Sequence, residues 1–199
     1  MAVESSGTII MNDQMLESVS SFIYLGNKCQ FDFDSLVPVN HRIEIARSKF
    51  TALMKLWKAA SLSFKLKLNL FAATVGTIMK YGCEAWIMTS QVKKRLNGAN
   101  ASMLAVVLKS TSRQQAASPA YDIVAAVYRQ RHSYLGHLLR MDDKRMVRKI
   151  FIHEMPNEPP YPEGSLLEHW HIPLSSIVDM AQHRSCWKEK EMIAKFKDS

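Results

Sequence analysis

The sequence predicts a mainly α-helical fold, a multi-helix bundle with a small antiparallel β-hairpin at its N-terminus. Two observations support this class. Apolar residues recur at i, i+3, i+4 and i+7 spacing along several long stretches that begin near Val39. Between Phe22 and Phe31 they instead follow a near two-residue alternation, which is typical of a half-buried strand. Hydrophobic residues make up 47% of the 199 residues, which is enough for one sizeable core.

Residues 8–31 are predicted to form the hairpin region. Thr8–Met11 and Met15–Val19 flank an Asn-Asp dipeptide with good turn chemistry, so they are expected to pair. The strand from Phe22 to Phe31 follows. Gly26 inside that strand predicts a bulge, or a place where another backbone approaches closely.

Residues 39–152 are predicted to form a helical domain. Pro38 and Pro119 fit first-turn positions, Gly82 fits the position after a helix end, and Asp142 fits an N-cap. Val147, Ile150 and Phe151 are expected to face inward. The helices are predicted at about Val39–Lys58, Ser63–Lys80, Gln91–Lys109, Pro119–Leu139 and after Asp142.

Residues 153–165 are predicted to be a proline-rich linker, because four prolines and a glycine leave no room for a regular element. Residues 166–199 follow as a helical tail, with helices expected at Pro173–His183 and Trp187–Lys197.

The charge pattern indicates a soluble intracellular protein with a polyanionic partner. The net charge is +8, from 26 Lys and Arg against 18 Asp and Glu. Three widely spaced cysteines without a Cys-x-x-Cys pair are typical of a reduced compartment. The polar start does not resemble a secretion signal. The longest apolar run, Leu68–Met79, is too short for about 30 Å of hydrocarbon, so no membrane partner is expected.

Basic side chains gather in two places, on the first long helix and between residues 129 and 149. The alternatives are a solvated rim and a surface that binds nucleic acid, and the clustering favours the second. The candidate nucleic-acid-binding residues are Arg42, Lys49, Lys55, Lys58, Arg129, Arg131, Arg140, Lys144, Arg145, Arg148 and Lys149.

Some acidic and histidine pairs invite a metal interpretation. Asp32-Phe-Asp34 and Asp142-Asp143 are explained more simply by a turn and a helix N-cap. His169-x-His171 with His183-x-x-Cys186 offers zinc-type ligands, but the spacing matches no closed structural site. We expect no metal and no cofactor.

Several separated blocks together resemble the C-terminal part of non-LTR (LINE-type) retrotransposon reverse transcriptases. They occur in the same order and cover most of residues 8–187, weakest at 154–171, where the family's Gly-Arg-Pro segment is not recognisable. His183 stands where the family usually has Asp. The blocks are Phe22–Gly26, Arg42–Ala46, Leu56-Trp57, Tyr81–Trp86, Tyr134–Met141 and Met180–Trp187.

The resemblance implies the end of a palm domain followed by a thumb that holds a primer–template duplex. It implies primer-grip-like roles for Phe22, Tyr24, Leu25 and Gly26, and RNA or an RNA–DNA hybrid as the partner. The family's paired catalytic aspartates belong upstream of Phe22, where this sequence has none, so we expect no polymerase activity and no catalytic residue. A decayed, inactive protein and a polymerase subunit remain the alternatives; the oligomeric state is open.

Overall fold

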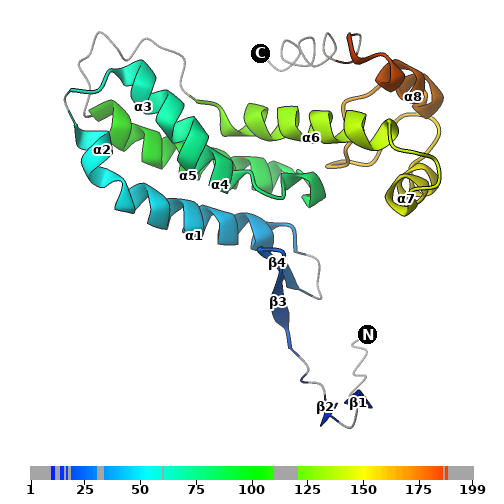
Figure 1. Cartoon of the computed structure of the whole chain (residues 1–199), viewed down its shortest axis with the longest axis horizontal. Helices are drawn as coiled ribbons and strands as arrows, with labels where there is room; N and C mark the ends of the chain where they lie inside the picture. The colour runs from blue at the N-terminus through cyan, green and yellow to red at the C-terminus, as the bar shows by residue number, and fades with distance from the viewer. Residues whose placement is uncertain are drawn as a thin grey trace.

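The protein is mostly helical with a small antiparallel sheet near the N-terminus, as predicted (Figure 1). The computed structural model describes residues 10–11, 14–15, 17, 19–30, 34–59, 61–109, 121–185 and 187. The helices are α1 (Leu36–Ala52), α2 (Met54–Lys58), α3 (Phe64–Phe71), η1 (Ala72–Gly76), α4 (Thr77–Met79), η2 (Cys83–Ala85), α5 (Ser90–Lys109), α6 (Ile123–Leu139), α7 (Met146–Glu154) and α8 (Leu174–Gln182).

Two short hairpins form the N-terminal region, β1 (Ile10–Met11) with β2 (Gln14–Met15), and β3 (Ser21–Tyr24) with β4 (Asn27–Gln30). The first was predicted, with longer strands. The second hairpin lies where a single bulged strand from Phe22 to Phe31 was predicted, so that prediction is wrong. Leu25 and Gly26 have φ of 47° and 78°, so the chain reverses in a tight two-residue turn.

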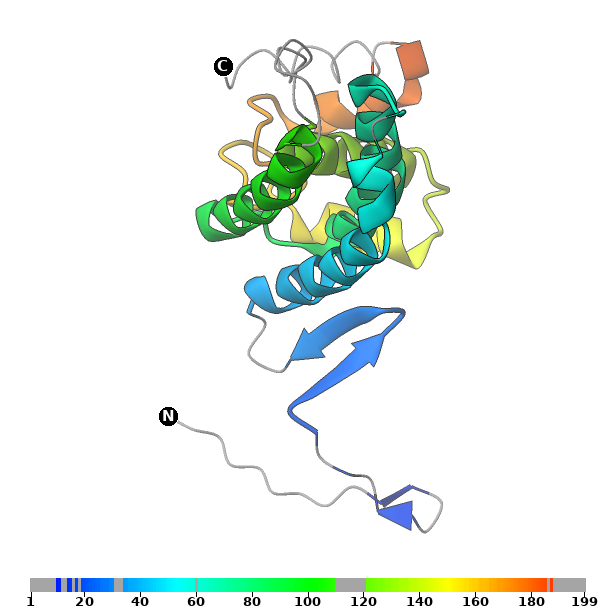
Figure 2. The ribbon, with the colours of Figure 1, turned by 90° about the vertical axis from the view of Figure 1, so that its left-hand side faces the viewer.

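The strand β3 is exposed, contrary to the half-buried strand predicted. Phe22, Ile23, Tyr24 and Leu25 are each more than half exposed. Of the two strands of this hairpin, β4 lies against α1, and Figure 2 shows both hairpins below α1, on the side away from the other helices. The alternation of apolar residues predicted a strand correctly, but no described element packs over the exposed apolar side chains of β3.

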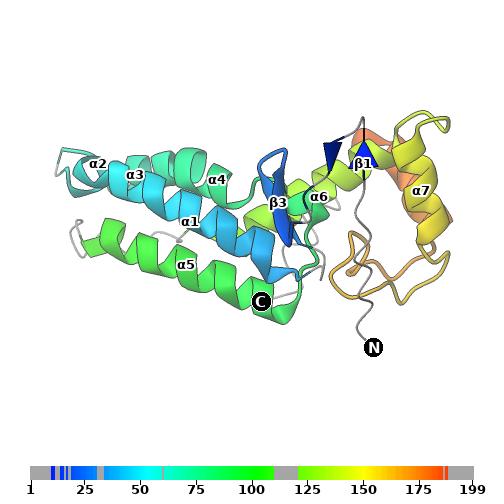
Figure 3. The same cartoon turned by 90° about the horizontal axis from the view of Figure 1, so that it is seen from below.

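The first core lies among α1 to α5 and the start of α6. In Figure 3, α1 and α5 lie side by side. Four aromatic rings pack at its centre: Phe50 stacks on Trp57 with ring centroids 5.5 Å apart, and Phe71 meets Trp57 at 6.2 Å and Tyr121 at 5.8 Å. The predicted Val39–Lys58 helix is interrupted at Leu53, which lets α2 turn Trp57 into this core.

The helix predicted at Ser63–Lys80 forms as α3, η1 and α4 in succession. Ser63 caps it, accepting a hydrogen bond from the Leu66 amide at 3.3 Å. The middle segment, η1, is a π-helical turn, where the hydrogen-bonding ladder widens by one residue. Gly82 has φ of 74°, in agreement with its predicted place after the helix end.

The long helix α6 joins the first core to a second one (Figure 1). It begins at Ile123 and not at Pro119, which lies outside the described residues. Asp122 caps it by accepting from the Ala125 amide at 3.0 Å. The second core consists of Leu135, Leu139, Tyr161, Leu167, Trp170, Leu174, Ile177, Ala181 and Trp187.

The helix α7 differs most from its prediction. Asp142 does not cap it; the carboxylate accepts from the Lys144 amide at 2.7 Å in a turn, and the helix starts at Met146. No residue of α7 is buried, and Val147 and Ile150 are about half exposed. The predicted inward face is therefore wrong for Val147 and Ile150, whereas Phe151 is half-buried and packs against the second core.

The predicted linker is helical at its first two residues, which end α7, but from Met155 to Ser165 it has no helix or strand, as predicted, and it packs tightly. Tyr161 is buried, and its hydroxyl donates to the Ile172 carbonyl at 2.9 Å. The Asn157 carbonyl accepts from the Leu174 amide at 2.8 Å, at the start of α8. The segment is thus part of the second core. Residues 188–199 of the predicted tail lie outside the described residues. No described helix has the length and apolarity to cross a membrane.

Candidate nucleic-acid interface

Three of the predicted basic residues form one exposed group on α1 and α2. Lys49, Lys55 and Lys58 are all exposed, because they lie away from the stripe that buries Phe50 and Trp57. We call them the α1–α2 lysines. No hydrogen bond or ion pair with another described residue engages their ammonium groups.

A second exposed group surrounds the start of α7. Lys144, Arg145 and Lys149 are exposed, and we call them the α7 basic group. Arg148 differs: its guanidinium is mostly buried and pairs with the Asp143 carboxylate. The ion pair leaves Arg148 less available to an external phosphate than its neighbours.

The two basic groups lie at opposite ends of the molecule. In Figures 1 and 3, α2 lies at one end of the long axis and α7 at the other, with α6 running between the two cores. The sequence prediction treated the basic residues as one surface. The structure does not bring them together, so a ligand that contacts both groups must extend along the molecule.

Arg42 is buried and holds the hairpin to the helices. Its Nη2 donates to the Asn27 side-chain oxygen at 3.3 Å, and its guanidinium lies over the Tyr81 ring at 4.2 Å. Burial lowers the pKa of Arg42, while the neighbouring Tyr81 acts in the opposite direction. The Tyr81 hydroxyl donates to the Leu25 carbonyl at 3.3 Å. The sequence predicted that another backbone approaches Gly26; the structure places the Arg42 side chain there instead, with Nη2 at 2.9 Å from where a Cβ atom on Gly26 would lie.

Arg131 is buried at 3% exposure and acts as a structural clamp. Its Nη1 donates to the carbonyls of Cys83, at 2.9 Å, and Trp86, and its Nη2 donates to the Gly164 carbonyl at 2.7 Å. Burial lowers its pKa. Three backbone oxygens from two distant loops thus occupy this guanidinium, so we remove Arg131 and Arg42 from the proposed nucleic-acid-binding set.

Arg140 and Arg129 have different surroundings. Arg140 is half-buried and donates to the Ala181 carbonyl at 3.0 Å, which fixes the end of α6 to α8. Arg129 is exposed and lines a pocket beside α6. Of the residues that resemble a primer grip, Phe22, Tyr24 and Leu25 are exposed on the projecting hairpin.

The histidine His132 lies in an aromatic stack that the sequence did not reveal. Its ring stacks on Trp170 at 5.2 Å and lies 5.5 Å from Trp187. The two tryptophans stack on each other at 5.3 Å. Because its partners lie tens of residues away along the chain, local sequence patterns gave no signal. The stack connects α6 to the C-terminal part of the second core.

Burial of His132 predicts a loss of stability in mild acid. Burial lowers the pKa of His132 from 6.5 to about 4, mainly by desolvation and to a smaller extent through the nearby His169. Well above pH 6.5 the imidazole is neutral in the folded and in the unfolded chain, so it does not lower the free energy of unfolding. As the pH falls towards 4, only the unfolded chain takes up the proton, so the folded state loses up to about 3 kcal/mol.

Urea unfolding at pH 7.5 and pH 4.5 measures this loss for the wild type and for His132→Phe. The phenylalanine variant should lose less stability between the two pH values than the wild type, by about 1–3 kcal/mol. The exposed His171, replaced in the same way, serves as the matched control. Equal losses for wild type and His132→Phe would contradict the prediction.

The alternative metal sites find no support in the geometry. No group of three or more His, Cys, Asp or Glu side chains suited to a metal ion occurs among the described residues. His169 packs its ring against Tyr128 at 5.0 Å. Asp32 and Cys186, which belong to two of the candidate sets, lie outside the described residues.

Comparison with known protein families, with curated proteins and with solved structures finds no match.

Proposed function

We propose that this chain binds RNA or an RNA–DNA hybrid without sequence specificity, as a thumb-like fragment related to non-LTR reverse transcriptases. The observation that supports the proposal best is the pair of exposed basic groups at the two ends of the long axis. No ion pair with another described residue neutralises a member of either group. The family resemblance supports it independently.

The physical basis is the neutralisation of phosphates. Each lysine or arginine that contacts a phosphate releases a condensed counterion, which gives affinity that does not depend on sequence and weakens as salt rises. The six cations of the two groups are exposed and free to make such contacts. The exposed rings of Phe22 and Tyr24 offer surfaces on which unpaired bases could stack, in line with their primer-grip-like positions.

Fluorescence anisotropy with a labelled RNA–DNA hybrid, titrated between 50 and 300 mM salt, tests the proposal. Replacing Lys49, Lys55 and Lys58 by glutamine should reduce the slope of log affinity against log salt by about 2–3. The same change in the α7 basic group should have a similar effect. Lys65→Gln, an exposed lysine of α3, is the matched single control and should change the slope by at most about 1.

The outcomes separate the proposal from its alternatives. Absent or salt-insensitive binding by a folded chain would refute it and favour an inactive, decayed protein. The exposed apolar side chains of β3 would then promote self-association, which size-exclusion chromatography detects. Primer extension with dNTPs and Mg²⁺ tests the alternative of a polymerase subunit, and we expect none from this chain.

A further inference from the structure

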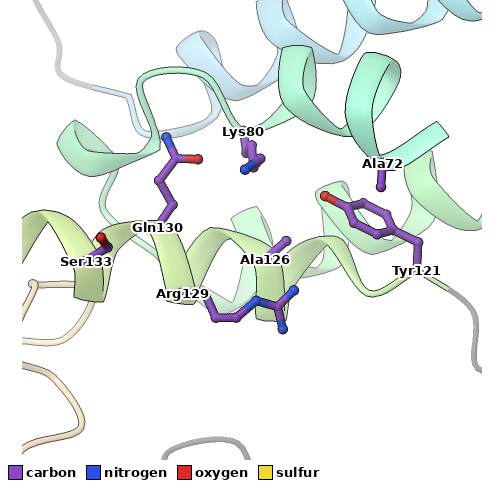
Figure 4. Close-up of a pocket in the computed structure, with 7 residues that line it drawn as sticks. All are labelled: Ala72, Lys80, Tyr121, Ala126, Arg129, Gln130 and Ser133. Atoms are coloured by element: carbon purple, nitrogen blue, oxygen red, sulfur yellow. The ribbon is translucent and has the colours of Figure 1, made fainter. Parts of the chain in front are cut away.

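A pocket of about 400 Å³ lies between α6 and the π-helical segment η1 with its continuation to Lys80 (Figure 4). It is separate from the α1–α2 lysines and from the α7 basic group. No sequence pattern pointed to it. The lining residues are Ala72, Lys80, Tyr121, Ala126, Arg129, Gln130 and Ser133.

The pocket follows from helix periodicity and from small residues. Ala126, Arg129, Gln130 and Ser133 have the spacing of one helical face, so α6 supplies one wall. On the opposite wall Ala72 offers only a methyl group, with Lys80 beyond it, and on α6 the small Ala126 faces the pocket in Figure 4. This pairing of small side chains leaves the space open.

Tyr121 closes one end of the pocket, and its ring can lie there because Gly76 in η1 has no side chain. A Cβ atom on Gly76 would lie 2.7 Å from the Tyr121 hydroxyl, so only glycine lets the ring lie this close to the π-helical turn. Burial raises the pKa of Tyr121. Its hydroxyl therefore keeps its proton at neutral pH and serves as a donor.

Four hydrogen-bond donors around the pocket are uncommitted. Within the described residues, neither a hydrogen bond nor an ion pair engages the side chains of Lys80, Tyr121, Arg129 or Ser133. None of the described residues that line the pocket carries a carboxylate. The nearby Glu84 carboxylate accepts the amide of Gln130 at 2.7 Å, and Asp122 caps α6 through the Ala125 amide.

We propose that this pocket binds the phosphate group of a nucleotide. A phosphate monoester brings a charge of about −2 and three acceptor oxygens, which suit an ammonium, a guanidinium and two hydroxyls. Lysine supplies a compact charge and arginine a fork that matches two oxygens. The pocket volume lies within the range of about 300–1,000 Å³ that is usual for small-ligand sites. It is therefore larger than a phosphate group alone would fill.

This ligand chemistry has two sources, a free nucleotide and the phosphorylated end of a nucleic acid strand. The first does not depend on the function proposed above. The second deepens that function, because it places a strand end beside α6. Both sources require Lys80, which is not part of either basic group on the surface.

Isothermal titration calorimetry of the full chain with a nucleoside 5′-monophosphate, the corresponding nucleoside and inorganic phosphate tests the proposal. The monophosphate should bind at least tenfold more tightly than the nucleoside. Lys80→Gln and Ser133→Ala should each weaken it, the lysine change by tenfold or more. Lys65→Gln, at an exposed lysine of α3 that lies outside the pocket and outside both basic groups, should leave it unchanged. Circular dichroism confirms that each variant is folded.

A second arm compares a single-stranded oligonucleotide with and without a 5′-phosphate. Tighter binding of the phosphorylated strand, lost in Lys80→Gln, assigns the site to strand ends; binding of the monophosphate alone assigns it to free nucleotides. Equal binding of nucleoside and monophosphate, or no effect of Lys80→Gln on either ligand, would overturn the proposal. A hybrid without terminal phosphates tests the surface groups separately, so the two proposals can fail independently.

Discussion

Replacing Arg131 by methionine should destabilise the fold by about 3–5 kcal/mol. The side chain is 3% exposed, and its guanidinium satisfies three carbonyl oxygens, those of Cys83, Trp86 and Gly164. Methionine fills a similar volume but has no donor, so these oxygens stay buried without a partner. Loss of the desolvation cost of the charge offsets only part of this effect.

Urea unfolding monitored by far-UV circular dichroism measures the change for Arg131→Met. Arg129→Met is the matched control, because Arg129 is exposed two residues earlier in the same helix and should cost less than about 0.5 kcal/mol. A change below about 1 kcal/mol for Arg131→Met would show that the clamp does not contribute as described. Because Arg131 connects α6 to the loops at Cys83 and Gly164, its loss should also loosen the contact between the two cores.

Replacing Trp57 by alanine should cost about 3–5 kcal/mol. Its ring is fully buried between Phe50 and Phe71, with centroid distances of 5.5 and 6.2 Å. Its Nε1 donates to the Phe50 carbonyl at 2.9 Å. Alanine would leave a large cavity at the centre of the first core, where helices from four parts of the chain meet and relaxation is limited.

Trp57→Phe separates packing from hydrogen bonding at Trp57, and Phe22→Ala is the control at an exposed position. Trp57→Phe keeps most of the ring volume and should recover more than half of the loss. Phe22→Ala, on the exposed strand β3, should change the free energy of unfolding by about 0.5 kcal/mol or less. Similar losses for Trp57→Ala and Phe22→Ala would mean that Trp57 is not the centre of the core.

The predicted helices show where sequence patterns are reliable. The sequence predicted an apolar helical stripe between Val39 and Lys58. Within it Ile43, Ala46, Phe50 and Trp57 are buried, and Leu53 and Met54 are half-buried. The same reasoning failed for Val147 and Ile150, which have helical spacing but no partner surface among the described residues. Apolar periodicity predicts which face of a helix can be buried, but that face is buried only where another element packs against it.

The candidate site shows the same division. Clustering along the chain identified Lys144, Arg145 and Lys149, and these are exposed together because a turn followed directly by a short helix keeps them near one another in space. It also included Arg131, which is enclosed by backbone from two other loops. A cation's environment depends on residues far away in sequence, so charge counting could not separate the two cases.

The sequence by itself determined the mainly helical class, the positions of the long helices and the supply of basic side chains, because these depend on local spacing and composition. Only the tertiary structure decided which cations are exposed, that Arg42 and Arg131 hold loops together, and that a donor-lined pocket lies beside α6. The reason is physical: exposure, desolvation and hydrogen bonding depend on which distant segments pack together, and no local pattern encodes that choice.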